Sequence, residues 1–382
     1  MIQVGDVHKC CGCSACVSVC RHNAITMQSG VLGFKYPEID DSKCVDCGLC
    51  ENVCSFQTRN CKMAARPIKS YAVRHRKIRE VETSRSGAAF IALSNLILGN
   101  GGVVYGAGYG EHFSVKHKRA INRISRDEFK GSKYAQSCMC GIYEEIKNDL
   151  AEGKQVLFSG TPCQTAAVRS YVPTRLHENL FLIDIICHGV SSPEVWDDYL
   201  CYLEKKERKS IVKVDFRDKS IFGWSGLHKE SFVFNDGIKR TFQYTYYSDL
   251  LIRPSCNVCP YSNLNRPSDI TIGDFWGWER ACPTLNIDDK GCSLVLINSV
   301  KGFELFENGL DDLHAIEVPL SQCLQPNLQH PTAENPLRSK FERDYEKRGF
   351  EYIMRKYGEV GMKYHCLRII RFAKRQIKKL VK

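Results

Sequence analysis

Residues 10–20 have the sequence Cys10-Cys11-Gly12-Cys13-Ser14-Ala15-Cys16-Val17-Ser18-Val19-Cys20, and residues 44–54 have the sequence Cys44-Val45-Asp46-Cys47-Gly48-Leu49-Cys50-Glu51-Asn52-Val53-Cys54. The second run repeats a four-cysteine spacing of the first at an offset of 34 residues. Gaps of two residues let three thiolates surround one iron–sulfur cube, while the fourth cysteine begins a segment that leads away. The repeat therefore predicts an internal duplication that holds two 4Fe–4S clusters.

The fourth cysteine of each run determines how the ligands are shared, because in ferredoxins with two clusters it binds the cluster of the other run. We therefore assign one set of ligands to each cluster: Cys10, Cys13, Cys16 and Cys54 to the first, and Cys44, Cys47, Cys50 and Cys20 to the second. A pair of zinc sites is the alternative, but it would leave four thiols unused. Arg21 and Ser55 follow the fourth cysteines, where ferredoxins usually carry proline. We expect this departure to shift the cluster potentials without preventing ligation.

The composition indicates that the duplication belongs to a larger redox protein. The chain has 382 residues, of which 21 are cysteines. It contains no run approaching ~18 apolar residues and no apolar N-terminal signal, so we expect a cytoplasmic protein without a transmembrane helix. Because disulfides are rare in that compartment, this many cysteines indicates metal or redox chemistry.

The formal net charge of +11 would suit an anionic partner such as nucleic acid. The two clusters of the duplication, together with a third for which the other cysteines leave room, would lower it to roughly +5, since each oxidised cluster carries about −2 with its thiolates. A weakly basic enzyme that handles phosphate-bearing cofactors has the same balance. We therefore expect no nucleic-acid partner.

Beyond a non-periodic linker at residues 55–68, short apolar runs alternate with helical stretches. Strands are predicted at residues 71–74, 103–107, 155–159, 181–186, 212–216, 270–273 and 294–298. Helices are predicted at residues 88–98, 142–152, 161–171, 193–207 and 303–308. The alternation is typical of an α/β domain with a mostly buried sheet. No GxGxxG sequence opens a strand-to-helix turn, so a Rossmann dinucleotide site is not supported.

We therefore expect two folded parts and a tail. Residues 1–60 are predicted to form an α+β ferredoxin-like two-cluster module, residues 69–340 an α/β domain with a mixed sheet, and residues 345–382 a basic helical tail. The tail has an apolar stripe among its Lys and Arg residues, made of Cys366, Ile370, Ala373, Ile377 and Leu380. Such a helix could contact the inner face of a membrane peripherally, and docking on the domain with a solvated basic face is the alternative.

Two segments of the large domain are candidates for binding phosphate. Ser84-Arg85-Ser86-Gly87-Ala88 precedes a predicted helix, whose positive end favours an anion, although a serine N-cap explains the same residues. Lys130-Gly131-Ser132-Lys133-Tyr134-Ala135-Gln136-Ser137 combines cations, hydroxyls and an aromatic ring. A solvated loop is the alternative for this second segment.

Four scattered cysteines could bind a third cluster. In Ser159-Gly160-Thr161-Pro162-Cys163-Gln164, Cys163 stands at a helix start, where the dipole favours a thiolate. Cys187 follows a strand, and Cys256 and Cys259 have the two-residue gap of a shared metal. By spacing alone, Cys138 and Cys140 are rival ligands, and Cys163 on its own could be structural.

Several motifs occur in one order: Ser86-Gly87, Gly131-Ser132-Lys133-Tyr134, Gly160-Thr161-Pro162-Cys163-Gln164, Cys187-His188-Gly189, Cys256 with Cys259, and Ser268-Asp269-Ile270-Thr271-Ile272-Gly273-Asp274-Phe275-Trp276-Gly277. In this order they resemble the beta subunit family of coenzyme F420 hydrogenase and dehydrogenase. The resemblance covers roughly residues 1–300.

The resemblance implies a flavin-binding large domain that holds FAD and a further 4Fe–4S cluster. The implied cluster ligands are Cys163, Cys187, Cys256 and Cys259. The implied flavin-pocket residues are Ser84, Ser86, Gly87, Lys133, Tyr134, Ser137, Thr161 and Gln164. His188 becomes a candidate catalytic proton donor, with packing behind the cluster as the alternative, and Asp274 and Trp276 either border the flavin or close the sheet. Ala88 departs from the family pattern, because relatives usually have a second glycine there.

These assignments predict an iron–sulfur flavoprotein oxidoreductase, since a flavin exchanges two electrons as a hydride whereas a cluster passes one at a time. A one-electron carrier such as ferredoxin is expected to dock near the two-cluster module. An organic substrate of unknown identity, or a deazaflavin-type partner, is expected to meet the FAD. The alternative is an electron-transfer subunit of a larger redox complex that has no substrate site of its own.

Overall fold

The central sheet of the large domain has the strand order β13-β3-β12-β11-β7-β6-β4-β5 in the computed structural model, which describes residues 5–56, 66–226, 229–242 and 248–358. Its strands are β3 (Lys69–His75), β4 (Val103–Tyr109), β5 (Val115–Ala120), β6 (Val156–Gly160), β7 (Leu180–Ile185), β11 (Ile270–Asp274), β12 (Ser293–Ile297) and β13 (Leu313–Glu317). The four strands β4, β6, β7 and β11 are parallel, and antiparallel strands extend the sheet on both sides. The predicted α/β domain with a mixed sheet is confirmed.

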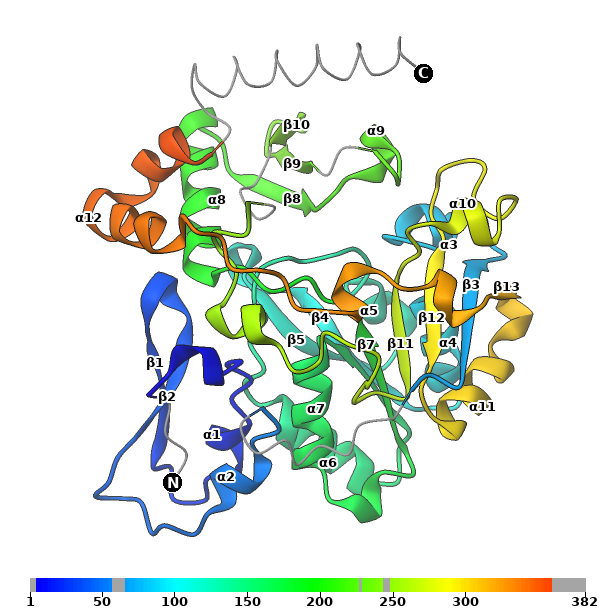
Figure 1. The fold of residues 1–382 in the computed structure, drawn as a ribbon, viewed down its shortest axis with the longest axis horizontal. Coiled ribbons are helices and arrows are strands. Elements are labelled where there is room, and N and C mark those ends of the chain that lie inside the picture. The colour runs from blue at the N-terminus through cyan, green and yellow to red at the C-terminus, as the bar shows by residue number, and fades with distance from the viewer. Residues whose placement is uncertain (1–4, 57–65, 227–228, 243–247, 359–382) are drawn as a thin grey trace.

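Helices cover both faces of this sheet (Figure 1). They are α3 (Ile78–Thr83), α4 (Ala89–Gly99), α5 (Arg123–Asp127), α6 (Ile142–Ala151), α7 (Pro162–Tyr171), α8 (Pro193–Glu207), α9 (Lys219–Phe222), α10 (Trp278–Ala281), α11 (Val300–Asn308) and α12 (Arg338–Lys356). Alternate residues of β6 point to opposite sides: Val156 and Phe158 pack with α6 and α7, whereas Leu157 packs with α4 and α11. Burial on both faces explains why the parallel strands are nearly all apolar.

The N-terminal module contains α1 (Ala15–Val19), β1 (Ile25–Ser29), β2 (Lys35–Ile39) and α2 (Leu49–Val53), with β1 and β2 antiparallel. It lies directly against the large domain (Figure 1). Ala15 and Val53 share a core with α6 and α7, while the hairpin tip carries Phe34 into a second core with Trp196 of α8. Because both ends of the module are buried in cores of the large domain, its position is fixed by packing.

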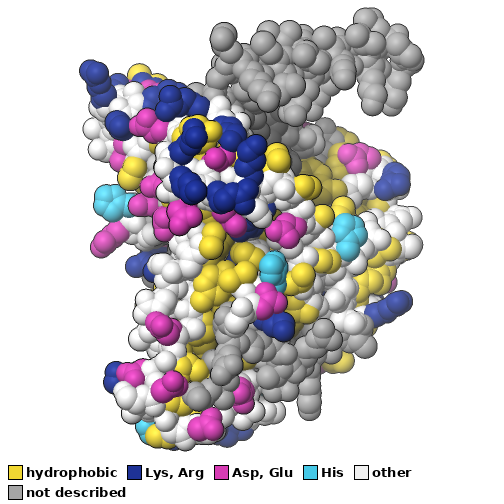
Figure 2. Space-filling view, turned by 60° about the vertical axis from the view of Figure 1, so that its left-hand side comes forward, with side chains coloured by type: hydrophobic (Ala, Val, Ile, Leu, Met, Phe, Trp, Pro, Cys, Tyr) yellow, Lys and Arg dark blue, Asp and Glu magenta, His cyan; other side chains and the backbone are white. Residues whose placement is uncertain are grey.

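A second, three-stranded sheet has the order β10-β9-β8 and lies beside α8 and α12. It consists of β8 (Ile211–Asp215), β9 (Glu230–Phe234) and β10 (Lys239–Phe242). Phe232 packs against Trp196, with ring centroids 6.4 Å apart. Lys and Arg side chains gather on the side of the molecule that carries α12 (Figure 2).

Each of the seven predicted strands and five predicted helices corresponds to an element of the structure. Strand 212–216 lies in the small sheet and not in the central one. Helix α12 begins at Arg338 and so crosses the boundary expected near residues 340–345, and residues 359–382 of the predicted tail lie outside the described residues. In the part of the chain that the structure describes, no helix is both long and apolar enough to cross a membrane.

Candidate iron–sulfur and cofactor site

The carboxyl ends of the central parallel strands carry most of the predicted site residues. Thr161 directly follows β6, Cys187 comes two residues after β7, and Asp274 ends β11. Parallel strands end at the same edge of a sheet, and open α/β sheets bind their ligands outside that edge. The topology therefore brings these three sequence-distant motifs to one side of the domain.

Four cysteines of the large domain gather at this edge. Cys163 lies in the first turn of α7, where Thr161 and Gln164 form a capping box, and Cys256 lies in a short 3-10 helix at Pro254–Val258. Burial, followed by the neighbouring thiols of Cys256, Cys163 and Cys259, raises the pKa of Cys187 well above its usual value. Burial together with Cys259 and Cys163 raises the pKa of Cys256 to about 12.

Such a group of half-buried thiols suits a cluster, because neighbouring thiolates need a cation between them. Within the described residues, no three His, Cys, Asp or Glu side chains have the geometry for a single metal ion. Four thiolates are the ligand set that a 4Fe–4S cube takes, so the chemistry of these donors suits the predicted third cluster.

The first N-terminal ligand set is also brought together. Burial raises the pKa of Cys16, and so do Cys13, Cys10 and Cys54 in that order. Cys54 is the fourth cysteine of the second run, so its thiol lies with the first three of the first run. This is the crossed arrangement that two-cluster ferredoxins use.

The second ligand set lies further out. Cys20, Cys44, Cys47 and Cys50 line one hollow, together with His22 and Val45. Cys47 is exposed, and Val45 is 59% exposed. By contrast, Cys16 is buried between the module and α6 and α7. The second set is therefore the one nearer to solvent.

The first and third sets meet at Cys11, a buried cysteine outside the ligand spacing. The neighbouring thiols of Cys13 and of Cys163 on α7, together with burial, raise the pKa of Cys11 well above its usual value. The Tyr143 hydroxyl donates to the Cys13 carbonyl at 2.8 Å, and the Tyr261 hydroxyl donates to the Ser55 carbonyl at 2.9 Å. The module and the large domain are thus joined where one ligand set adjoins the other.

We expect Cys11→Ala to retain all the iron, because Cys11 contacts ligands of two sets without completing either. Removing a buried sulfur should cost about 1 kcal/mol or a little more of stability, and no cluster. Iron and acid-labile sulfide per chain check this, with Cys163→Ala measured in parallel. Loss of iron in Cys11→Ala alone would make Cys11 the ligand and Cys163 the spare thiol.

The predicted phosphate segment at Ser84 to Ala88 does not cap the following helix. The N-cap of α4 is Ala88, with φ 65° and no side-chain cap. Ser86 Oγ donates to the Cys292 carbonyl at 2.7 Å, while Ser84 Oγ is buried without a hydrogen-bond partner among the described residues. A Cβ on Gly87 would lie 2.1 Å from the Val73 carbonyl oxygen, so close packing on β3 requires this glycine.

The positive φ of Ala88 explains why relatives usually have glycine at this position, since glycine adopts this conformation without steric cost.

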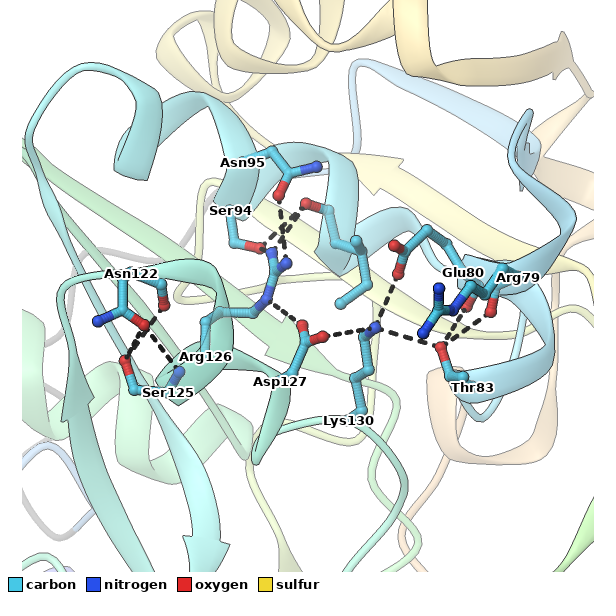
Figure 3. Close-up of polar contacts among 11 residues, drawn as sticks. Arg79, Glu80, Thr83, Ser94, Asn95, Asn122, Ser125, Arg126, Asp127 and Lys130 are labelled. Carbon is cyan, nitrogen blue, oxygen red and sulfur yellow. Dashed lines mark hydrogen bonds and ion pairs between the residues drawn. The ribbon is translucent and has the colours of Figure 1, made fainter.

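Figure 3 shows the contacts of Lys130, the first residue of the second candidate segment, with the end of α3. Lys130 Nζ donates to Glu80 at 2.7 Å, to Asp127 at 3.0 Å and to Thr83 at 3.2 Å. Lys130 therefore ties the start of the second candidate segment to α3, which leads into the first.

The other predicted flavin-pocket residues form two groups. Gln164 donates to Ser137 Oγ at 2.8 Å and accepts from the Thr161 amide at 3.0 Å. These three residues therefore form one hydrogen-bonded group next to Cys163. Lys133 donates to the carbonyls of Glu128 and Lys130 at 3.0 Å, within its own loop. Burial lowers the pKa of Lys133 to about 7.

Tyr134 lies instead with a group of cations that sequence analysis missed. Arg217 donates to the Tyr134 hydroxyl at 3.3 Å and to Asp274 at 2.7 Å, and its carbonyl accepts from Arg85. Burial opposes ionisation of Asp274, but Arg217 and Arg85 together hold its pKa below the usual value. Burial and then Arg85 lower the pKa of Lys219 to about 7.

Trp276 closes one side of this group. Its ring stacks on Trp224 with centroids 4.7 Å apart, and Arg217 lies 5.4 Å from its centroid. The cations Arg85, Arg217 and Lys219 lie beside two acids, Asp274 and Asp215, so the balance of charge still favours an anionic group there. The residues thus suit the pyrophosphate of a dinucleotide cofactor.

His188 lies next to Cys187 and is held on both ring nitrogens. Nε2 lies 2.7 Å from Asp249, and Nδ1 lies 3.3 Å from Asn327 and Thr332. Hydrogen bonding to Asp249 raises the pKa of His188. Thr332 also donates to the His188 carbonyl at 2.6 Å, so this network holds the backbone beside Cys187 in place.

The fold and the cysteine groups define an iron–sulfur redox protein of the oxidoreductase class. Residues 9–58 match the 4Fe-4S dicluster domain, which confirms the two N-terminal clusters. Residues 153–321 match the family described as the C terminus of the coenzyme F420 hydrogenase/dehydrogenase beta subunit, which confirms the resemblance given by the motifs. The chain is thus an iron–sulfur redox protein related to the F420 hydrogenase beta subunit.

A solved structure of the F420-reducing [NiFe] hydrogenase complex from Methanosarcina barkeri contains a similar chain, at 17% identity and a TM-score of 0.48. The match covers 76% of the present chain and 92% of the other. No curated protein sequence matches the chain.

Proposed function

We propose that this protein is an iron–sulfur flavoprotein oxidoreductase. In this proposal, the two-cluster module at residues 1–60 exchanges single electrons with a ferredoxin-like carrier. The domain at residues 69–340 holds a third 4Fe–4S cluster and FAD. The FAD meets an organic substrate or a deazaflavin-type partner.

The closeness of Cys11 to both Cys13 and Cys163 carries the proposal, because it means that the first and third ligand sets lie next to each other. The second set lies at the surface, where Cys47 is exposed. This order supports a path that begins at the outer cluster, continues through the buried one and ends in the large domain. A one-electron carrier would then dock beside Val45 and Cys47.

The cationic group supports FAD as the group held in the large domain. Bound FAD would supply the exchange between single electrons and a hydride. Arg85, Arg217 and Lys219 would hold its phosphates, and Ser84 has a buried hydroxyl that no described residue satisfies. Tyr134 and Trp276 offer aromatic surfaces beside the same cations.

The substrate side of the proposal rests on the family description, which names coenzyme F420, and on the place of His188 beside Cys187. His188 would donate a proton to the reacting partner, with Asp249 holding the ring and favouring its protonated form. The same description names a beta subunit, which favours a second candidate: an electron-transfer subunit of a larger complex. Contact of the basic C-terminal segment with an anionic membrane stays a prediction.

Anaerobic purification with iron, sulfide and flavin counts tests the proposal. About twelve irons and one FAD per chain are expected, four irons for each cluster. Bleaching of the flavin by reduced ferredoxin, followed by its reoxidation with a deazaflavin, would complete the evidence. Eight irons without flavin would overturn it, and turnover that requires an added partner protein would favour the subunit alternative.

A further inference from the structure

Cys138 and Cys140 are two exposed thiols that the proposed function does not use. Their sulfurs lie 2.6 Å apart, and the Cys140 amide donates to Cys138 Sγ at 3.3 Å. Neither thiol is grouped with Cys163, Cys187, Cys256 or Cys259. The pair is therefore a separate site, although its spacing made it a rival for the third cluster.

The backbone holds the two thiols in this arrangement. The Cys138 amide donates to the Val115 carbonyl at 2.9 Å, and the His117 amide donates to the Cys138 carbonyl at 2.9 Å, which fixes Cys138 to β5. Met139, between them, is 1% exposed and packs in the core under α6. Because this side chain points inward, both neighbours are held toward solvent, and bringing their sulfurs together requires little further ordering.

The environment distinguishes the two thiols. Burial and then the neighbouring Cys138 raise the pKa of Cys140 to about 11. Burial thus disfavours the thiolate of Cys140, so we assign Cys140 the resolving role and Cys138 the attack on the disulfide. An attacking thiol and a resolving thiol in contact are the components that a dithiol–disulfide couple needs.

We propose that Cys138 and Cys140 form a redox-active dithiol–disulfide couple whose reaction partners are small-molecule disulfides of the glutathione type. Cys138 attacks one sulfur of the small disulfide, forms a mixed disulfide and releases one thiol. Cys140 then attacks Cys138, closes the protein disulfide and releases the second thiol. The protein loses two electrons and two protons, which reduce the small disulfide to two thiols, and the reverse reaction restores the dithiol.

The couple lies on a segment that also contacts the first ligand set. Gln136, two residues before Cys138, donates to the Cys11 carbonyl at 2.9 Å, and Tyr143, three residues after Cys140, donates to the Cys13 carbonyl. Closing the disulfide would therefore alter a segment that supports the Cys10–Cys16 loop. The couple itself does not depend on flavin or on the proposed electron path.

In the test, the full-length holoprotein is equilibrated anaerobically in buffers of reduced and oxidised glutathione, and its free thiols are then alkylated. After digestion, mass spectrometry measures the mass of the peptide of residues 134–147. We expect an internal disulfide, whose peptide is about 2 Da lighter than the unalkylated dithiol peptide. Its fraction should rise from about a tenth to about nine-tenths as the ratio of the squared concentration of reduced glutathione to the concentration of oxidised glutathione falls about 100-fold. Returning the protein to reduced buffer should reverse the change.

Cys201 on α8 is a matched control, because it is also exposed and can form only a mixed disulfide with glutathione. Cys138→Ser and Cys140→Ser should each behave like Cys201. The double variant should keep the iron content of the unmodified protein, which separates this couple from cluster ligation. The proposal is overturned if the peptide stays alkylated at both cysteines in every buffer, if it carries only mixed disulfides, or if the double variant loses iron.

Discussion

Cys256→Ala is expected to remove the third cluster, and with it about four of about twelve irons per chain. Cys256 is half-buried among Cys187, Cys259 and Cys163, and alanine offers no ligand in place of its sulfur. The two N-terminal clusters should remain, since their ligands lie in other groups. Iron and sulfide counts, together with the electron paramagnetic resonance of the reduced protein, measure the loss.

Electron delivery to the flavin should fail in the same variant, because in the proposed path the third cluster passes electrons from the first cluster to the flavin. Reduced ferredoxin should still reduce the two N-terminal clusters. Cys323→Ala is the matched control, since Cys323 is a fully buried cysteine of the same domain outside the ligand set. Full iron content in Cys256→Ala would remove Cys256 from the site.

The central strands were predictable because their burial on both faces leaves continuous apolar runs, as in β7 and β12. The edge strands β5 and β13 were missed, since each has an exposed face and carries polar residues such as Lys116 and His314. Strand 212–216 was recognised, but its place in the small sheet depends on pairing with β9, which local pattern does not reveal.

The cysteine sets were likewise predictable only where spacing is informative. The two N-terminal runs follow from their repeat, whereas Cys163 and Cys187 lie 24 positions apart, so spacing left Cys138 and Cys140 as rivals and only the resemblance favoured this set. The contacts that join the sets come from residues without any motif. Tyr143, Tyr261 and Arg253 have ordinary sequence surroundings, and only the folded chain shows that they reach the cluster loops.

Arg253 connects the first ligand set to the segment that carries Cys256. It is 0% exposed, and its guanidinium donates to the carbonyls of Cys10 at 2.8 Å and Lys35 at 2.9 Å and to Gln136 at 3.0 Å. It also lies 3.7 Å from Cys10 Sγ, and Tyr36 stacks on it at 4.4 Å. Burial raises the pKa of Cys10, and the charge of Arg253 acts against this.

We expect Arg253→Gln to lower the reduction potential of the first cluster. A reduced cluster carries one more negative charge, so removing a nearby cation disfavours reduction. At an effective dielectric constant of about 20, a charge roughly 4–8 Å from the cluster contributes about 2–4 kcal/mol, which corresponds to about 90–170 mV for one electron. A potentiometric titration followed by electron paramagnetic resonance measures the shift for each cluster.

Arg253→Lys separates the charge from the hydrogen bonds, because lysine keeps the cation but not the planar fork that reaches three acceptors at once. It should leave the potential of the first cluster nearly unchanged, yet lower the stability by about 2–3 kcal/mol, since buried carbonyls lose their donors. Arg253→Gln should lose both. If the glutamine variant folds with full iron and every cluster keeps its potential, the Arg253 charge does not act on the first cluster, and its role is confined to joining the module to the large domain.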